Sequence, residues 1–159
     1  MSDNNWLHNK RGEWYVIIQA VLMVLVLVAP KLDAHLRSPS LFGIKVVGAL
    51  LCIAGSLFVI LGSVGLGRNL SPFPKPKETS SLVESGVFSV VRHPIYSGVS
   101  LCAFGWGLIW NSLAALVLAS ALLAFFDVKA RREERWLETR FSAYPAYKRR
   151  VKRLIPWVY

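Results

Sequence analysis

Residues 41–66, LFGIKVVGALLCIAGSLFVILGSVGL, form an apolar run that contains one charged side chain, Lys45, and a few small polar ones. A helix needs about 20 largely apolar residues to cross a hydrocarbon core of about 30 Å. We therefore predict a transmembrane helix here. Gly48, Gly55 and Gly62 recur along it at heptad spacing. Since small residues let helices approach closely in lipid, this stripe favours packing against a neighbouring helix over contact with a ligand.

A second apolar run, residues 14–30, is interrupted by Gln19 and also predicts a spanning helix. Lys10 and Arg11 precede it, which is an arrangement typical of a signal peptide. No good cleavage site of small residues follows, and further spans come later, so we interpret the run as a retained helix.

A third apolar stretch is interrupted by the polar pair Asn111-Ser112, which indicates a turn. We predict two helices, 95–110 and 113–127, that form a tight hairpin. At 1.5 Å per residue each is about 24 Å long or less, so each must tilt or continue past the interface. The second is expected to continue into the charged tail as one long helix.

The composition agrees with an integral membrane protein. The 159 residues are 54% hydrophobic, above the roughly 45–50% of soluble domains. This length predicts one domain, 1–159, with an all-α fold of about four transmembrane helices, an inner loop 67–94 and a basic helical tail 128–159. Cys52 and Cys102 lie in apolar runs without metal-type spacing, so we predict neither a metal site nor a disulfide.

The formal net charge of +10 is distributed unevenly along the chain. If the N-terminus lies inside, only Lys31, Arg37 and Lys45 fall toward the outer side. Because short cytoplasmic loops carry an excess of Lys and Arg, we predict that both termini are cytoplasmic.

The inner loop has proline at every second position, Pro72, Pro74 and Pro76, which predicts a stiff, extended segment. It ends in RHPIYSG, residues 92–98, where a cation, an imidazole and a phenol gather at the start of a helix. Pro94 suits the first turn of that helix, and free N–H groups there favour an anion. Spacing alone leaves a second interpretation open, in which Arg92 and His93 anchor lipid headgroups.

The tail carries adjacent carboxylates, Glu133 and Glu134, among cations. The i,i+4 spacing of Lys129 and Glu133 is that of a weak surface pair. A solvated basic helix on anionic lipid is the alternative interpretation, and it explains two adjacent glutamates poorly. The basic run 148–153 predicts affinity for an anionic inner leaflet, and no recognisable nucleic-acid module accompanies it.

These motifs, in their order along the chain, resemble the isoprenylcysteine carboxyl methyltransferase and phospholipid methyltransferase superfamily of integral membrane enzymes. The resemblance covers residues 62–156. Ser142, where family members often have glycine, and Pro145, between two tyrosines, depart from the pattern. The motifs that carry the resemblance are Leu66-Gly67-Arg68-Asn69 with the proline-rich loop, RHPIYSG 92–98, a helical hairpin, Glu133-Glu134-Arg-Trp-Leu137, Phe141-Ser-Ala-Tyr144-Pro-Ala-Tyr147, and Val151 to Ile155-Pro156.

The resemblance implies that S-adenosylmethionine binds at the cytosolic membrane face, between the hairpin and the inner loops. Arg92, as a partner for a carboxylate, and Glu133 are the expected catalytic residues. Gly65 and Gly67 are implied near the cofactor, or they end the second helix. The implied cofactor-binding residues are His93, Tyr96, Glu133, Glu134, Gly65 and Gly67.

Methyl transfer from a sulfonium is a direct displacement, which depends on proximity and alignment and needs no covalent nucleophile. The Tyr96 ring is expected near the sulfonium as a cation–π partner. A carboxylate acceptor needs no base, whereas an amine needs one, such as His93 or a glutamate. We expect the first and second spans to wall a lipid-open groove for an apolar substrate tail.

The sequence leaves the acceptor and the oligomeric state open. O-methylation of a lipophilic carboxylate is the first hypothesis, with phospholipid N-methylation and thiol methylation as alternatives. A sterol-reductase-like enzyme is disfavoured by the small size, and a non-enzymatic lipid-binding scaffold is a further alternative. A compact four-helix form resembles prokaryotic members of the family, which implies a plasma membrane.

Overall fold

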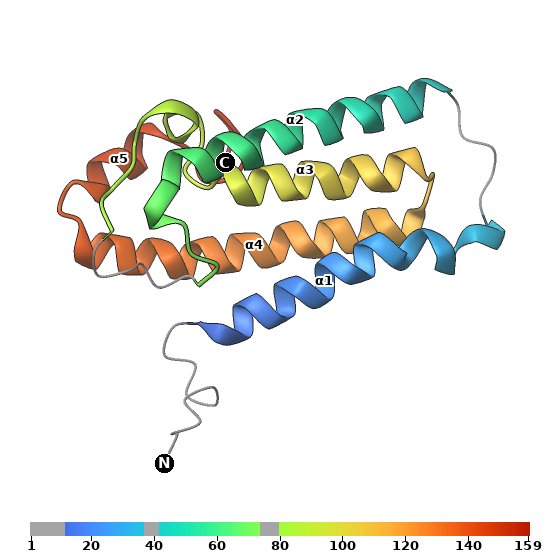
Figure 1. Ribbon diagram of the computed structural model, residues 1–159, viewed down its shortest axis with the longest axis horizontal. Coiled ribbons are helices and arrows are strands. Elements are labelled where there is room, and N and C mark those ends of the chain that lie inside the picture. Colours follow the sequence, from blue (N-terminus) through green and yellow to red (C-terminus); the bar gives the residue numbers. More distant parts are fainter. Residues whose placement is uncertain (1–11, 37–41, 74–79) are drawn as a thin grey trace, which may run out of the picture.

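The computed structural model of this protein describes residues 12–36, 42–73 and 80–159. These residues form helices without any β-strand, which confirms the all-α prediction, and one isolated bridge pairs Val91 with Lys152. The helices are α1 (Glu13–Leu32), α2 (Phe42–Leu66), α3 (Pro94–Ile109), α4 (Leu113–Arg140) and α5 (Tyr144–Arg150), with short 3-10 turns η2 (Ala34–Leu36), η3 (Gly67–Asn69) and η4 (Gly86–Ser89) (Figure 1).

Several residues used in the sequence predictions lie outside the described ranges. They include Lys10, Arg11, Arg37, Leu41 and the segment 74–79, which holds Pro74 and Pro76. The predicted extended conformation of the proline segment therefore stays a prediction.

Three helices are long and apolar enough to cross a membrane: Glu13–Leu32, Phe42–Asn69 and Leu113–Arg140. Helix α3 has 16 residues and is shorter than these, so a fourth complete span stays a prediction. The predicted hairpin is confirmed, because a short turn at Asn111, whose φ is 48°, joins α3 to α4. The Ser112 hydroxyl then caps α4 by accepting a hydrogen bond from Ala115 N. Helix α4 continues without a break into the charged tail, as expected.

The glycine stripe of α2 packs against α3, which confirms the packing interpretation. A Cβ atom built on Gly55 would lie 2.5 Å from the Gly98 carbonyl oxygen, and one on Gly48 would lie 2.7 Å from that of Gly105. The Cys52 and Cys102 thiols each donate to the other residue's carbonyl, at 3.6 and 3.5 Å. The backbones of α2 and α3 therefore approach closely, as small-residue interfaces allow in lipid.

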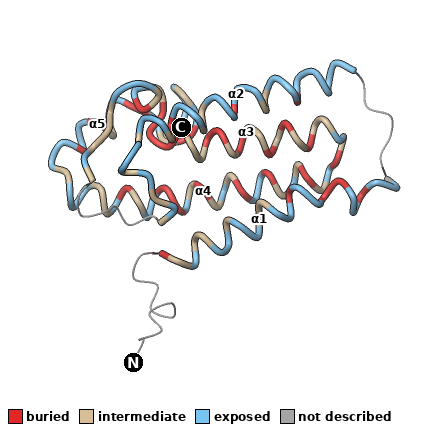
Figure 2. The backbone as a smooth tube through the Cα atoms, in the orientation of Figure 1, coloured by how far each residue is buried: buried red, intermediate tan, exposed pale blue. Residues whose placement is uncertain are grey.

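The helices lie side by side in the order α2, α3, α4, α1 (Figure 1). Burial concentrates on α3 and α4, whereas α1 and α2 expose many apolar side chains, such as Val21 and Leu57 (Figure 2). The expected groove between the first and second spans is wrong along most of their length, because the α3–α4 hairpin lies between them. Among the described residues, Gln19 in the first half of α1 and Leu66 at the end of α2 line a common cavity.

The end of the bundle where α3 and α4 are joined is held by a buried carboxylate. Asp33, 8% exposed, follows α1 and accepts from the Ser112 hydroxyl at 2.8 Å and from Ala114 N at 3.1 Å. A carboxylate is favourable at the N-terminus of a helix, where N–H groups lack intrahelical partners. This contact fixes the end of α1 against the start of α4.

Candidate functional site

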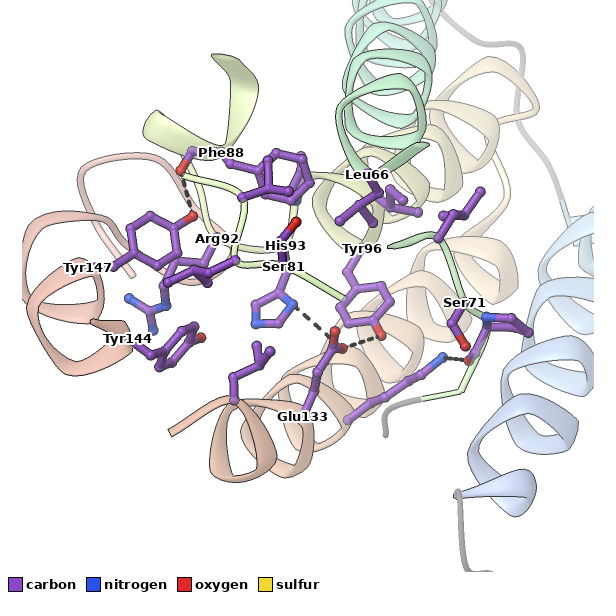
Figure 3. A pocket seen from close by; sticks show the side chains of 18 of the residues that line it. Leu66, Ser71, Ser81, Phe88, Arg92, His93, Tyr96, Glu133, Tyr144 and Tyr147 are labelled. Atoms are coloured by element: carbon purple, nitrogen blue, oxygen red, sulfur yellow. Dashed lines mark hydrogen bonds and ion pairs between the residues drawn. The ribbon is translucent and has the colours of Figure 1, made fainter. Parts of the chain in front are cut away.

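A cavity of about 350 Å³ lies at the α5 end of the bundle, where the start of α3 meets the charged half of α4 (Figure 3). Helix α1, the end of α2, the loop around η4 and helix α5 complete its wall. Its polar lining consists of Gln19, Ser71, Ser81, Arg92, His93, Tyr96, Lys129, Glu133, Tyr144 and Tyr147. Apolar side chains make up the rest, so the cavity combines an apolar wall with a few polar groups, as ligand sites do.

Glu134 belongs to a buried ion cluster. It is 2% exposed and accepts from Arg92 Nη2 at 2.8 Å and from Arg153 Nε at 3.0 Å. His93 Nε2 lies 3.3 Å from the same carboxylate. The cluster joins the start of α3, the last third of α4 and the C-terminal segment. Glu134 is not among the residues that line the cavity.

Arg92 is engaged through all three of its guanidinium nitrogens. Nε and Nη2 donate to Glu134, and Nη1 donates to the backbone carbonyls of Lys148 and Val151. The backbone N–H of Arg92 also donates to the Lys152 carbonyl at 2.8 Å. Arg92 borders the cavity, but its hydrogen-bonding capacity is directed to the protein.

Glu133 points in another direction from Glu134, because consecutive residues on a helix are about 100° apart. It lines the cavity and its side chain is 26% exposed. Tyr96 Oη donates to it at 2.8 Å, and His93 Nδ1 lies 3.8 Å away (Figure 3). The Tyr96 ring is stacked with His93 and Phe126, at centroid distances of 5.3 and 4.8 Å. This stacking fixes the phenol that holds the carboxylate.

Lys129 is one of the cavity residues that the sequence prediction did not include. It was interpreted as a surface partner of Glu133, yet it is 1% exposed and lines the cavity. Its Nζ donates to Gln19 Oε1 at 2.5 Å and to the Pro72 carbonyl at 3.1 Å, and it lies 5.1 Å from the Tyr96 ring centroid. Gln19 could have indicated a buried polar partner such as Lys129, because a lone polar residue in an apolar span needs one.

Gly65 and Gly67 lie at the end of α2 and are not among the cavity-lining residues. A Cβ atom on Gly65 would lie 3.0 Å from the ring of Phe88, and Gly67 begins η3 with φ of 48°. Leu66 between them does line the cavity. Gly65 therefore packs against the loop, Gly67 follows the last residue of α2, and a place for either glycine near the cofactor stays a prediction.

Helix α5 contributes two buried tyrosines, which the sequence analysis treated only as part of a family motif. Tyr147 Oη donates to the Phe88 carbonyl at 2.6 Å, and burial raises the pKa of Tyr147 above its usual value, so the hydroxyl stays protonated. Tyr144 is 1% exposed and also lines the cavity. Pro145 lies in the first turn of α5, where proline is tolerated, so this departure from the family pattern leaves the helix intact.

The cavity therefore brings together His93, Tyr96 and Glu133, with Arg92 at its border. It adds Lys129, Gln19, Tyr144 and Tyr147, which the sequence prediction did not include.

Comparison with known proteins gives concordant matches. The family model described as phospholipid methyltransferase matches residues 44–144. The chain is 30% identical over 155 residues to the cobalt-zinc-cadmium resistance protein CzcN of Cupriavidus metallidurans, covering 97% of this chain and 67% of that protein. It is 36% identical over 117 residues to protein-S-isoprenylcysteine O-methyltransferase of Saccharomyces cerevisiae, covering 71% of this chain and 49% of that protein.

Among solved structures, the eukaryotic intramembrane Ras methyltransferase ICMT (isoprenylcysteine carboxyl methyltransferase) has a similar fold. The TM-score is 0.69 at 22% sequence identity, and the alignment covers 94% of this chain and 54% of that chain. This chain thus spans about half the length of the yeast enzyme and of the solved structure.

Proposed function

Because the chain belongs to the phospholipid methyltransferase family of integral membrane methyltransferases, we propose that it transfers a methyl group from S-adenosylmethionine to a lipophilic carboxylate at the cytosolic membrane face. The observation that carries the proposal is the convergence of Glu133, Tyr96, His93 and Lys129 on one cavity beside the membrane-spanning helices. The cofactor, the acceptor and the side of the membrane are all parts of this proposal.

The lining residues fit the chemistry of S-adenosylmethionine, which supplies an electrophilic methyl group on sulfur. Its ammonium and ribose hydroxyls are donors, and Glu133 is a partly exposed acceptor in the cavity wall. The buried Tyr144 hydroxyl offers a further polar contact. The cavity volume of about 350 Å³ lies within the range of small-molecule sites.

The residues of this chain act by binding and orientation. Tyr96 holds the Glu133 carboxylate in the cavity by donating to it at 2.8 Å. Arg92 and Glu134 act as positioning residues, since their ion cluster fixes the segment that begins α3 against α4. His93, which forms the start of α3 and contacts both glutamates, connects this cluster to the cavity. No covalent nucleophile is needed, because alignment supplies most of the advantage in such a displacement.

Lys129 supports a carboxylate as the methyl acceptor. Its ammonium group lies in the cavity beside Gln19 of α1, the helix that exposes apolar side chains along its length. A lipophilic acid whose tail lies along α1 therefore presents its carboxylate to Lys129. The bond forms between a carboxylate oxygen and the methyl carbon while the carbon–sulfur bond breaks, which leaves S-adenosylhomocysteine and an ester. A neutral amine nucleophile would gain nothing from this cation, whereas a thiolate would, so Lys129 favours an anionic acceptor over an amine.

The exposed basic residues of the tail support contact with anionic lipid. They lie on α4, on α5 and after α5, and they are Arg131, Arg132, Arg135, Arg140, Arg149, Arg150 and Lys152. Each such residue near an anionic leaflet contributes about 1 kcal/mol to binding. We propose that this side faces the cytoplasm of a prokaryotic cell, with both termini there and the protein in the plasma membrane.

The binding part of the proposal is tested by calorimetry of the detergent-purified full chain with S-adenosylhomocysteine. The wild type is expected to bind, and Glu133→Gln and His93→Ala are expected to weaken binding by about tenfold or more. A folded wild-type preparation that binds neither S-adenosylhomocysteine nor S-adenosylmethionine contradicts the proposal. In that case a lipid-binding scaffold becomes the better account.

A further inference from the structure

Two tyrosines one turn apart on α5 line the same cavity but differ in their hydrogen bonds. Tyr147 Oη donates to the Phe88 carbonyl at 2.6 Å. Tyr144 Oη has no hydrogen-bond partner among the described residues, although the side chain is 1% exposed. In that part of the chain one other buried side-chain atom is unpartnered, Nε1 of Trp106, and Trp106 does not line the cavity.

A buried hydroxyl without a partner is unfavourable, and folded proteins keep few of them. Burial raises the pKa of Tyr144 above its usual value, so the group is a neutral donor at any physiological pH. Figure 3 shows its hydroxyl turned into the cavity, toward the His93 imidazole. Its orientation, burial and unused donor together indicate a group that is satisfied by a bound ligand.

The end of the cavity that holds Tyr144 is lined by apolar side chains and the two phenols, with Arg92 at its border, and every guanidinium nitrogen of Arg92 already donates to the protein. Leu82 and Leu137 pack against the Tyr144–Tyr147 cluster, and Phe88, whose carbonyl accepts from Tyr147, also lines the cavity. Glu133 of α4 lies farther from α5 along the cavity, beside Tyr96 (Figure 3). Lys129, one turn earlier on α4, lies beside Gln19 of α1. An apolar, aromatic end with one free donor suits a flat heteroaromatic ring with an acceptor nitrogen. It does not suit the amino-acid part of S-adenosylmethionine, which carries a charged ammonium group and a charged carboxylate.

We propose that the Tyr144 hydroxyl binds the purine of S-adenosylmethionine, donating a hydrogen bond to a ring nitrogen while Leu82, Phe88 and Leu137 enclose the ring. This inference rests on the proposed function and assigns the orientation of the cofactor within it. The purine lies at the α5 end, and the sulfonium and its methyl group lie toward Glu133 and Lys129. The tail helix α5 is thereby part of the cofactor site as well as of the membrane surface.

The test compares Tyr144→Phe with Tyr147→Phe in the full-length, detergent-purified chain. Calorimetry measures the affinity for S-adenosylhomocysteine and for its 1-deaza, 3-deaza and 7-deaza analogues, each of which lacks one ring nitrogen. Thermal unfolding without ligand measures stability. Tyr147→Phe is the matched control, since it leaves the Phe88 carbonyl without its donor and is expected to lower the unfolding temperature.

Tyr144→Phe is expected to weaken S-adenosylhomocysteine binding about tenfold without lowering the unfolding temperature, because it removes a hydroxyl that has no partner in the protein. One deaza analogue is expected to bind the wild type about tenfold more weakly than S-adenosylhomocysteine does. That analogue is expected to lose no further affinity from Tyr144→Phe.

If the wild type binds S-adenosylhomocysteine and the affinity of Tyr144→Phe for it is within about twofold of the wild-type affinity, this inference fails and the proposed function stands. If Tyr144→Phe weakens all three analogues as much as the parent ligand, the hydroxyl contacts another part of the cofactor and the purine assignment is overturned. If the wild type binds neither the parent ligand nor S-adenosylmethionine, the proposed function fails and this inference fails with it.

Discussion

The adjacent glutamates of α4 are predicted to have separable roles, which the matched pair of variants Glu134→Gln and Glu133→Gln tests. Glu134→Gln removes a negative charge from between two guanidinium groups, on Arg92 and Arg153, whose side chains are 5% and 14% exposed. Removal of one partner from a buried ion pair costs about 3–5 kcal/mol, because the remaining charge stays desolvated. Glu133→Gln keeps an oxygen that still accepts from Tyr96, so its cost is about 1 kcal/mol or less.

The assay is thermal unfolding in detergent, followed by tryptophan fluorescence, together with S-adenosylhomocysteine calorimetry at a temperature where both variants are folded. For a chain of this size, about 1 kcal/mol shifts the midpoint by about 2–4 °C. We expect Glu134→Gln to unfold on the order of 10 °C below the wild type. Glu133→Gln is expected within about 3 °C of the wild type, with affinity for the ligand reduced about tenfold or more.

Two outcomes refute this reasoning. One is an equal loss of stability in both variants, which would mean that Glu133 is also part of the structural cluster. The other is a Glu134→Gln variant that unfolds at the wild-type temperature but binds no ligand, which would place Glu134 in the cofactor site.

Three further predictions address the packing and the acceptor. Gly55→Val is expected to prevent folding, because its Cβ would lie 2.5 Å from the Gly98 carbonyl oxygen, whereas Gly43→Val meets open space and is expected to fold; purification yield and size-exclusion profile distinguish them. Asp33→Ala is expected to cost about 1–2 kcal/mol in thermal unfolding, because Ser112 and Ala114 N at the start of α4 lose their carboxylate acceptor, with ligand affinity unchanged; equal stability of variant and wild type would contradict this. Lys129→Met is expected to raise the KM for farnesylcysteine about tenfold or more and to leave S-adenosylhomocysteine affinity within about twofold; the opposite pattern would assign Lys129 to the cofactor.

Local properties of the sequence were enough to predict the helices. The length of the apolar runs and the polar interruption at Asn111 determine the spans and the hairpin turn, and neither depends on distant contacts. The stripe of Gly48, Gly55 and Gly62 correctly predicted a close helix contact. Its partners, Gly98 and Gly105, were not identified, because the register between two helices depends on how they cross.

The site was predicted less completely, because periodicity fixes which residues are neighbours but not how a helix is rotated. The i,i+4 spacing predicted a surface pair of Lys129 and Glu133, which was wrong, because Lys129 is buried and donates to Gln19 and the Pro72 carbonyl. The burial of Phe126 and Leu122 on α4 sets that rotation. Tyr144 was visible only as part of a motif, because an unused hydrogen-bond donor can be recognised only when the surrounding groups are in place.

The most direct test of the central claim is methyl transfer from S-adenosylmethionine labelled in its methyl group, with the purified wild type in phosphatidylglycerol-containing vesicles. The acceptors to compare are N-acetyl-farnesylcysteine, phosphatidylethanolamine and a small thiol. The account predicts label on farnesylcysteine that mild alkali releases as methanol, since a methyl ester is base-labile and an N-methyl or S-methyl group is not. Alkali-stable label on the amine or the thiol would contradict the carboxylate assignment, and no transfer to any acceptor by a folded, cofactor-binding protein would contradict the proposed reaction.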